Sequence, residues 1–265
     1  MEELDHSELS VLLIEPSITQ QGILINKLND EGVTSIEVVV DMNQALQQVE
    51  KYPPDLIVSN LYYEDGTAAD LLHKLREQDD FFELPFILVT SEQKRTHLEI
   101  FKQSGILAIL GKPFAQKELE KALKSAVSFV NKEDLYFENY DVNTLRVALV
   151  DDSTLARNSI NRVLKNLGLN NVIEFEDGCF AIEYLANNEI DLLITDYNMP
   201  KVNGIELTKF MKSSGEHSHV PILMISSEAR DAHLAKVYEH GVDAILNKPF
   251  DTVKIKEVLQ KMFDY

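Results

Sequence analysis

Acidic, hydroxyl and basic side chains follow four apolar segments in the second half of the chain. Asp151 and Asp152 end the first of these segments, Asp196 ends the next, Ser226 ends a third, and Lys248 follows a fourth. Three carboxylates brought together repel one another, so such a group requires a cation, and oxygen ligands favour a hard ion such as Mg²⁺. A lysine and a hydroxyl group nearby suit the oxygens of a phosphoryl group.

The chemistry that fits this set of side chains is covalent phosphoryl transfer. Mg²⁺ held by few carboxylates keeps open water positions and commonly handles phosphate. A carboxylate in such a site can attack phosphorus and form an acyl phosphate. Asp196 is the candidate nucleophile, because its segment is expected to lie beside the segment that carries Asp151 and Asp152.

A parallel β-sheet would position these side chains. Five short apolar segments alternate with stretches of helical periodicity, and they cover residues 146–152, 171–177, 191–196, 221–226 and 244–249. Strands that are apolar throughout and alternate with helices are typical of a parallel sheet covered on both faces. Ligands of such sheets bind beyond the carboxyl ends of the strands. We therefore expect a doubly wound α/β domain with its site at that edge.

The first half of the chain repeats the second half 136 residues earlier. This offset aligns Val11–Ser17 with Val147–Ser153, and Lys112–Phe114 with Lys248–Phe250. It also aligns four further pairs, Gly32 with Gly168, Asp55 with Asp191, Pro85 with Pro221, and Gly105 with Gly241. A period of this length indicates a duplicated domain. We predict one domain over residues 1–130, a polar linker over 131–144 and a second domain over 145–265.

The composition narrows the possible partners and compartment. The chain has 265 residues, a net charge of −19, one cysteine and no tryptophan. An acidic surface repels phosphate backbones and anionic lipids, so we expect neither nucleic acid nor membrane as a partner. A single cysteine excludes an internal disulfide, and the acidic start MEELDHSELS lacks the pattern of a secretory leader. A cytoplasmic protein is the expectation.

Four motifs of the second half together resemble the receiver domain of two-component response regulators, the CheY-like family. They are VDDS at Val150–Ser153, DYNMP at Asp196–Pro200, the hydroxyl residue Ser226, and NKPF at Asn247–Phe250. The resemblance spans all of residues 145–265. It implies two flavodoxin-like (βα)5 domains, each with a five-stranded parallel sheet in the order 2-1-3-4-5.

The resemblance also implies a phosphorelay role. Asp196 would accept a phosphoryl group from a sensor histidine kinase or a histidine phosphotransfer protein, with Lys248 and Ser226 contacting that group. One departure is Ile245, which stands where the family usually carries Tyr or Phe. We therefore expect the phosphorylated state to act through loop and helix shifts, without an aromatic switch.

A magnesium site follows from the same resemblance. Asp152, Asp196 and the backbone carbonyl of Asn198 would bind Mg²⁺ directly, and Asp151 would contribute through a water molecule. Asn198 and Glu228 occupy the two variable positions that flank the attacking water in members that lose the phosphoryl group quickly. A short-lived phosphorylated state is therefore a further expectation.

The first half lacks this chemistry at the aligned positions. The equivalents of the site residues are Glu15, Pro16, Asn60, Thr90 and Lys112. Proline offers no carboxylate and an amide is a poor nucleophile, so this half resembles a pseudo-receiver, and Lys112 is expected to pack or to pair with Glu15. We expect this domain to serve docking, homodimerisation or regulation, with the acidic, tyrosine-containing loop Leu61–Gly66 as a candidate contact.

Other classes of protein fit less well. A covalent-aspartate Mg²⁺ phosphohydrolase of the haloacid-dehalogenase pattern requires an acid where Asn198 stands. A flavin carrier of the same topology requires a hydroxyl-rich phosphate loop after the first strand. A role as a phosphate sink for another regulator remains an alternative to forward signalling. We expect no separate enzymatic turnover and no attached output module, and therefore output through contact with another protein.

Overall fold

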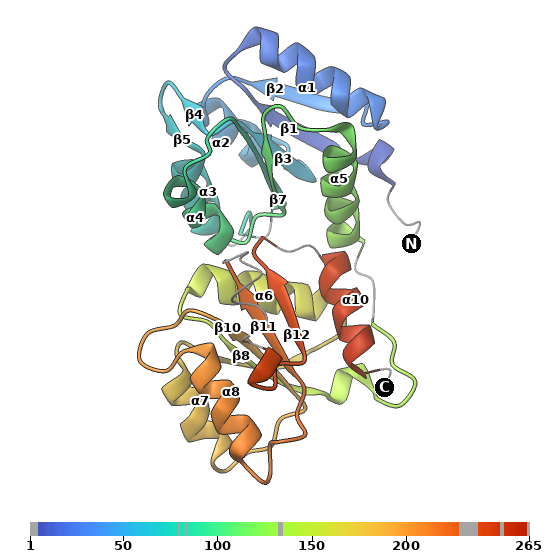
Figure 1. Cartoon of the computed structure of the whole chain (residues 1–265). Coiled ribbons are helices and arrows are strands. Elements are labelled where there is room, and N and C mark those ends of the chain that lie inside the picture. Colours follow the sequence, from blue (N-terminus) through green and yellow to red (C-terminus); the bar gives the residue numbers. More distant parts are fainter. Residues whose placement is uncertain are drawn as a thin grey trace. The chain divides into compact units, whose positions relative to one another are not determined.

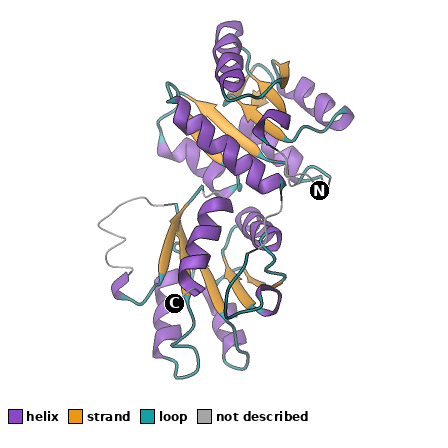
Figure 2. Ribbon diagram, turned by 90° about the vertical axis from the view of Figure 1, so that its right-hand side faces the viewer, coloured by secondary structure: helices purple, strands orange, loops and turns teal. Residues whose placement is uncertain are grey.

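The computed structural model describes residues 5–78, 80–82, 84–131, 135–227, 238–249 and 252–263. The chain forms two compact units, Met1–Lys132 and Glu133–Tyr265. In each unit a sheet is covered by helices on both faces (Figure 1 and Figure 2). The predicted doubly wound α/β class is thereby confirmed.

The first unit contains a five-stranded parallel sheet in the order β2-β1-β3-β6-β7. Its strands are β1 (Ser10–Ile14), β2 (Ser35–Val39), β3 (Leu56–Ser59), β6 (Phe86–Thr90) and β7 (Ala108–Gly111). Its helices are α1 (Ile18–Asp30), α2 (Met42–Lys51), α3 (Ala68–Arg76), α4 (Arg95–Gln103) and α5 (Gln116–Val130). The 3₁₀ turn η1 (His6–Glu8) comes before β1. Two short strands, β4 (Tyr62–Tyr63) and β5 (Gly66–Thr67), form a separate antiparallel hairpin that the sequence did not predict.

The second unit repeats this sheet. Its order is β12-β11-β10-β8-β9, built from β8 (Arg146–Val150), β9 (Asn171–Phe175), β10 (Leu192–Asp196), β11 (Ile222–Ser226) and β12 (Ala244–Asn247). The described helices are α6 (Thr154–Asn166), α7 (Gly178–Leu185), α8 (Gly204–Ser213) and α10 (Thr252–Phe263), with the 3₁₀ turn η2 (Val142–Thr144). Counted along the chain, both sheets have the order 2-1-3-4-5, as predicted.

Several residues shared by the two halves hold the strands and helices in place. The hydroxyl groups of Ser17 and Ser153 accept a hydrogen bond from the backbone at the start of α1 and α6, which satisfies one of the free N–H groups there. Asp55 and Asp191 each accept a backbone N–H from the first residue of β1 and β8, at 2.8 Å. The repeat therefore preserves contacts that position the strands, independently of any chemistry at the site.

Residues that precede β8 belong to the second unit. The backbone N–H of Leu135 donates to the carbonyl of Leu167 at 3.0 Å, and the Leu135 side chain is buried. The ring of Phe137 stacks on that of Phe263 in α10, with centroids 4.8 Å apart. Burial of these apolar side chains anchors this segment to the unit that follows it.

Candidate functional site

The carboxyl ends of β8, β10 and β12 bring three of the predicted residues together. The Nζ atom of Lys248 lies 2.7 Å from Oδ2 of Asp151 and 2.6 Å from Oδ1 of Asp196. The lysine side chain is 1% exposed, and the two aspartate side chains are 0% and 4% exposed. Because β8 and β10 are neighbours in the sheet, two carboxylates and one ammonium group share one buried position.

Backbone N–H groups complete the contacts of the two carboxylates. The second oxygen of Asp151 accepts the N–H of Ser153 at 2.9 Å. The second oxygen of Asp196 accepts the N–H of Asn198, also at 2.9 Å. Each carboxylate is thus held at both oxygens, and its orientation is fixed before any ligand arrives.

The electrostatics of the site are unbalanced, because the two buried anions share Lys248. The pKa of Asp196 is raised to about 6: burial is the largest cause, Lys248 opposes the increase, and the nearby charge of Asp151 adds to it. For Lys248 itself, burial favours a lower pKa, but the charges of Asp151 and Asp196 outweigh it and raise the pKa above its usual value. A further cation would relieve the repulsion between the carboxylates.

The remaining predicted residues differ in exposure, and one of them lies outside the described residues. Asp152 and Asn198 are exposed, whereas Ser226 is buried at the end of β11. Ile245 on β12 is half-buried and packs against the hydrophobic core. Glu228 lies outside the described residues, so its modulating role stays a prediction.

The oxygen donors suit a hard divalent cation. Among the residues that the structure describes, no three His, Cys, Asp or Glu side chains already converge on one point as a metal centre. Lys248 lies between Asp151 and Asp196, and Asp152 faces solvent. Two buried carboxylates with excess negative charge, beside a third carboxylate, nevertheless form a donor set of the kind that Mg²⁺ prefers.

Two segments match one protein-family model, that of the response regulator receiver domain. The matched residues are 11–124 and 147–260, which together make up most of the chain. The chain belongs to this family. It contains two receiver domains in tandem, one in each structural unit. The family resemblance predicted from the site motifs is confirmed.

Known proteins similar to this chain include chemotaxis regulators. Over 120 residues, 45% of this chain, it is 35% identical to chemotaxis protein CheY-3 of Vibrio cholerae serotype O1, of which it covers 92%. It is 32% identical to chemotaxis protein CheY of Pseudomonas aeruginosa over 120 residues, covering 97% of that protein. The solved structure of Vibrio cholerae CheY4 is 28% identical over 44% of this chain and 98% of its own, with a TM-score of 0.42.

The raised pKa of Asp196 predicts a pH dependence of stability in the receiver domain that carries it. Its folded pKa of about 6 exceeds the unfolded value of 3.8, so the folded state holds the proton more tightly between these values. The free energy of unfolding should therefore fall as the pH rises through this window. Asp196→Asn removes this titration. The free energy of unfolding of this variant minus that of wild type should therefore rise by about 2–3 kcal/mol between about pH 4 and pH 7.

Urea denaturation of both proteins at a series of pH values, with a chelator of divalent cations present, measures this difference. Adding Mg²⁺ at neutral pH should stabilise the wild type more than Asp196→Asn, because the metal compensates the ionised carboxylate. A stability difference between the two proteins that does not change with pH would contradict the raised pKa.

At the equivalent position of the first receiver domain, one lysine meets one carboxylate. Glu15 replaces the first aspartate, and its Oε2 atom lies 2.7 Å from Nζ of Lys112. The other oxygen of Glu15 accepts the N–H of Ser17 at 3.0 Å. Thr90 is buried at the end of β6, and the amide of Asn60 donates to a backbone carbonyl at 3.3 Å. One buried carboxylate is matched by one lysine, so the excess negative charge of the second domain is missing here.

The β4–β5 hairpin occupies the loop that was predicted to be a contact surface. Tyr63 is buried, its hydroxyl group bonds to that of Ser59, and burial raises its pKa. The two carboxylate oxygens of Asp65 each accept a backbone N–H at the start of α2, at 2.9 Å. Desolvation raises the pKa of Asp65, but these N–H donors outweigh it and lower the pKa overall. Tyr62 and Glu64 remain exposed.

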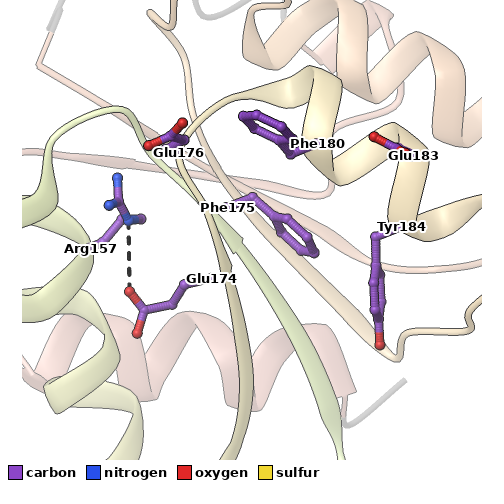
Figure 3. Close-up of a pocket in the computed structure, with 7 residues that line it drawn as sticks. All are labelled: Arg157, Glu174, Phe175, Glu176, Phe180, Glu183 and Tyr184. Carbon is purple, nitrogen blue, oxygen red and sulfur yellow. Dashed lines mark ion pairs between the residues drawn. The ribbon is translucent and has the colours of Figure 1, made fainter.

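Sequence reasoning missed Arg157, which connects the site to the edge of the sheet. Its guanidinium group donates to the backbone carbonyl of Asp151, and its Nε atom lies 3.7 Å from Oε2 of Glu174 on β9. Figure 3 shows this ion pair. A helical arginine gives no sequence signal for such a role, because the contact depends on how α6 packs against β8 and β9.

A pocket of about 590 Å³ opens beside this ion pair. Its lining combines aromatic rings with glutamates and consists of Arg157, Glu174, Phe175, Glu176, Phe180, Glu183 and Tyr184 (Figure 3). The lining includes none of the residues predicted from the sequence to carry the chemistry. This pocket is therefore separate from the group around Lys248.

Among the described residues, no helix combines the length and the apolar character that a bilayer crossing requires.

Proposed function

We propose that the second receiver domain is the phosphorylated switch of a phosphorelay, with Asp196 as the phosphoacceptor. The observation that carries this proposal is the contact of Asp196 with Lys248 at 2.6 Å in a buried position at the carboxyl end of the sheet. The donor would be a phosphohistidine on a sensor histidine kinase or a histidine phosphotransfer protein.

The transfer requires an ionised Asp196. With a pKa of about 6, this carboxylate is mostly ionised at neutral pH. One carboxylate oxygen attacks phosphorus, the bond from phosphorus to the histidine nitrogen breaks, and its electron pair returns to the imidazole, which then takes up a proton. Lys248 would pair with an oxygen of the transferred group. Ser226 lies at the end of the adjacent strand.

A bound Mg²⁺ would neutralise charge on the phosphoryl oxygens. The residues that would hold it are Asp152, Asp196 and the backbone carbonyl of Asn198, with Asp151 acting through water. Asp152 and Asn198 would supply exposed oxygen donors, whereas Asp151 and Asp196 are buried in contact with Lys248.

The first receiver domain is proposed to act without phosphorylation. Asn60 replaces the phosphoacceptor, Pro16 replaces a metal ligand, and Lys112 is already paired with Glu15. Its role would be docking, homodimerisation or regulation of the second domain, within a cytoplasmic protein that acts on another protein. We propose no turnover of a separate substrate.

Incubation with acetyl phosphate and Mg²⁺ tests the proposal by intact-protein mass spectrometry. Wild type should gain one phosphoryl group, Asp196→Asn none, and Asp152→Ala at least about tenfold less at equal times, because a metal ligand is lost. Asp65→Asn is the matched control in the first domain and should behave like wild type. A phosphoryl group on Asp196→Asn, or within residues 1–130 of any variant, would contradict the assignment.

A further inference from the structure

A pocket of about 540 Å³ lies in the first receiver domain. Its lining includes Glu15, Asn60 and Lys112 at strand ends, Ile23 and Lys27 on α1, and Phe114 after β7. The pocket opens at the carboxyl edge of the parallel sheet, where α/β proteins bind their ligands. Its volume lies within the usual range for small-molecule sites.

One face of α1 forms a wall of this pocket. Ile23 and Lys27 stand one turn apart on that face. Ile23 is 45% exposed, although it is apolar, and Phe114 is buried. The exposed isoleucine and the aromatic ring offer an apolar surface for the body of a ligand.

The polar groups of the pocket favour an anionic ligand. The Nζ atom of Lys27 lies 3.3 Å from the amide oxygen of Gln116 and 5.1 Å from the centre of the Phe114 ring. Both of these partners are neutral, and among the described residues Lys27 forms no ion pair with a carboxylate. Lys112 is paired with Glu15 but remains 19% exposed. A negatively charged head group would complete the contacts of Lys27.

The second receiver domain lacks this combination. The offset that relates the two halves aligns Ile23 with Ser159 and Lys27 with Val163. Val163 is buried in α6. The apolar wall and the lysine are therefore specific to the first domain, which also lacks the phosphoacceptor.

We propose that the first receiver domain binds a small organic anion, with an apolar body against Ile23 and Phe114 and an acidic head group near Lys27. The ligand would occupy the edge of the sheet that carries the phosphoacceptor in the second domain. This inference deepens the proposed regulatory role of the first domain, and it does not depend on phosphorylation of Asp196.

Phenylbutyrate is a suitable probe, because it combines an aromatic body with a carboxylate. Calorimetric titration into the full chain, with a chelator and without a phosphoryl donor, should show one saturable site. Acetate and phenylbutanol supply the head or the body alone and should bind at least about tenfold more weakly.

Two pairs of matched variants locate the binding site. Lys27→Glu and Ile23→Glu should each weaken phenylbutyrate binding at least about tenfold. Lys51→Glu is the control for the first, because Nζ of Lys51 also lies 5.1 Å from a ring centre, that of Tyr52, but outside the pocket. Ile18→Glu is the control for the second, because Ile18 is 83% exposed on the same helix. Both controls should bind like wild type.

The outcomes separate this inference from the phosphorelay proposal. Asp196→Asn should bind phenylbutyrate normally even though it accepts no phosphoryl group. No saturable binding up to about 10 mM would overturn the inference. Binding that Lys27→Glu and Ile23→Glu leave unchanged, or that acetate alone reproduces, would overturn it as well.

Discussion

Gly204→Ala is expected to lower the free energy of unfolding of the second receiver domain by about 3 kcal/mol or more. A Cβ atom at this position would lie 2.3 Å from the backbone carbonyl oxygen of Asp196 and 3.2 Å from its carbonyl carbon. Both contacts are with backbone, so no side-chain rotation relieves them. Either the start of α8 or the end of β10 must move, and the second movement displaces the proposed phosphoacceptor.

Chemical denaturation combined with hydrogen exchange resolved by peptide measures this effect in each domain separately. Phosphorylation by acetyl phosphate should fall together with stability, because Asp196 shifts with its backbone.

Gly22→Ala is the matched control. Gly22 lies within α1, and a Cβ atom there would meet nothing within 4 Å. Alanine should therefore stabilise the first domain by about 0.5–1 kcal/mol, the usual preference of a helix interior for alanine over glycine. Gly215→Ala, which is also free of close contacts, serves as the control within the second domain. Equal losses in Gly204→Ala and Gly215→Ala would contradict the packing argument.

The sequence predicted the sheet and the convergence of the site because both follow from local patterns. Segments that are apolar throughout predicted the parallel strands, and their polar ends placed Asp151, Asp196 and Lys248 at one edge. The repeat then predicted a second copy of the same sheet. Such inferences need only the chain order and the geometry of parallel strands.

The sequence did not predict contacts that depend on how elements pack. The bond from Arg157 to the carbonyl of Asp151 requires the position of α6 over the sheet. The capping of α2 by Asp65 requires the β4–β5 hairpin, which brings the carboxylate to that helix. Lys27 on α1 lines a pocket of the first domain, and no sequence motif predicts this position. Side-chain partners far apart in the chain are set by tertiary structure, which periodicity does not report.

The two domains differ in the charge balance of the same structural position. In the first domain Lys112 meets one carboxylate, that of Glu15. In the second domain Lys248 is shared by two carboxylates. The first arrangement is a closed ion pair, whereas the second retains excess negative charge that a metal ion or a proton can compensate. The charge at this position is therefore balanced within the first domain and unbalanced within the second.

Lys248→Met should lower the free energy of unfolding of the second domain by about 3–5 kcal/mol at neutral pH, because it leaves two buried carboxylates without their shared cation. Lys248 holds down the pKa of Asp196, which is about 6 in the wild type, so its removal raises that pKa further. The folded variant then holds a proton over a wider pH range than the unfolded chain. Its loss of stability should therefore be smaller at low pH and grow as the pH rises through neutrality.

Lys112→Met in the first domain makes the same substitution at the aligned position and is expected to cost only about 1–2 kcal/mol. Lys112 is 19% exposed, and Glu15 keeps the hydrogen bond from the backbone of Ser17. Hydrogen exchange resolved by domain, at several pH values and with a chelator present, compares the two variants directly. Equal losses of unfolding free energy in the two variants, or a loss in Lys248→Met that does not change with pH, would show that the second carboxylate adds no unbalanced charge. That result would also remove the electrostatic basis for metal and phosphoryl binding at Asp196.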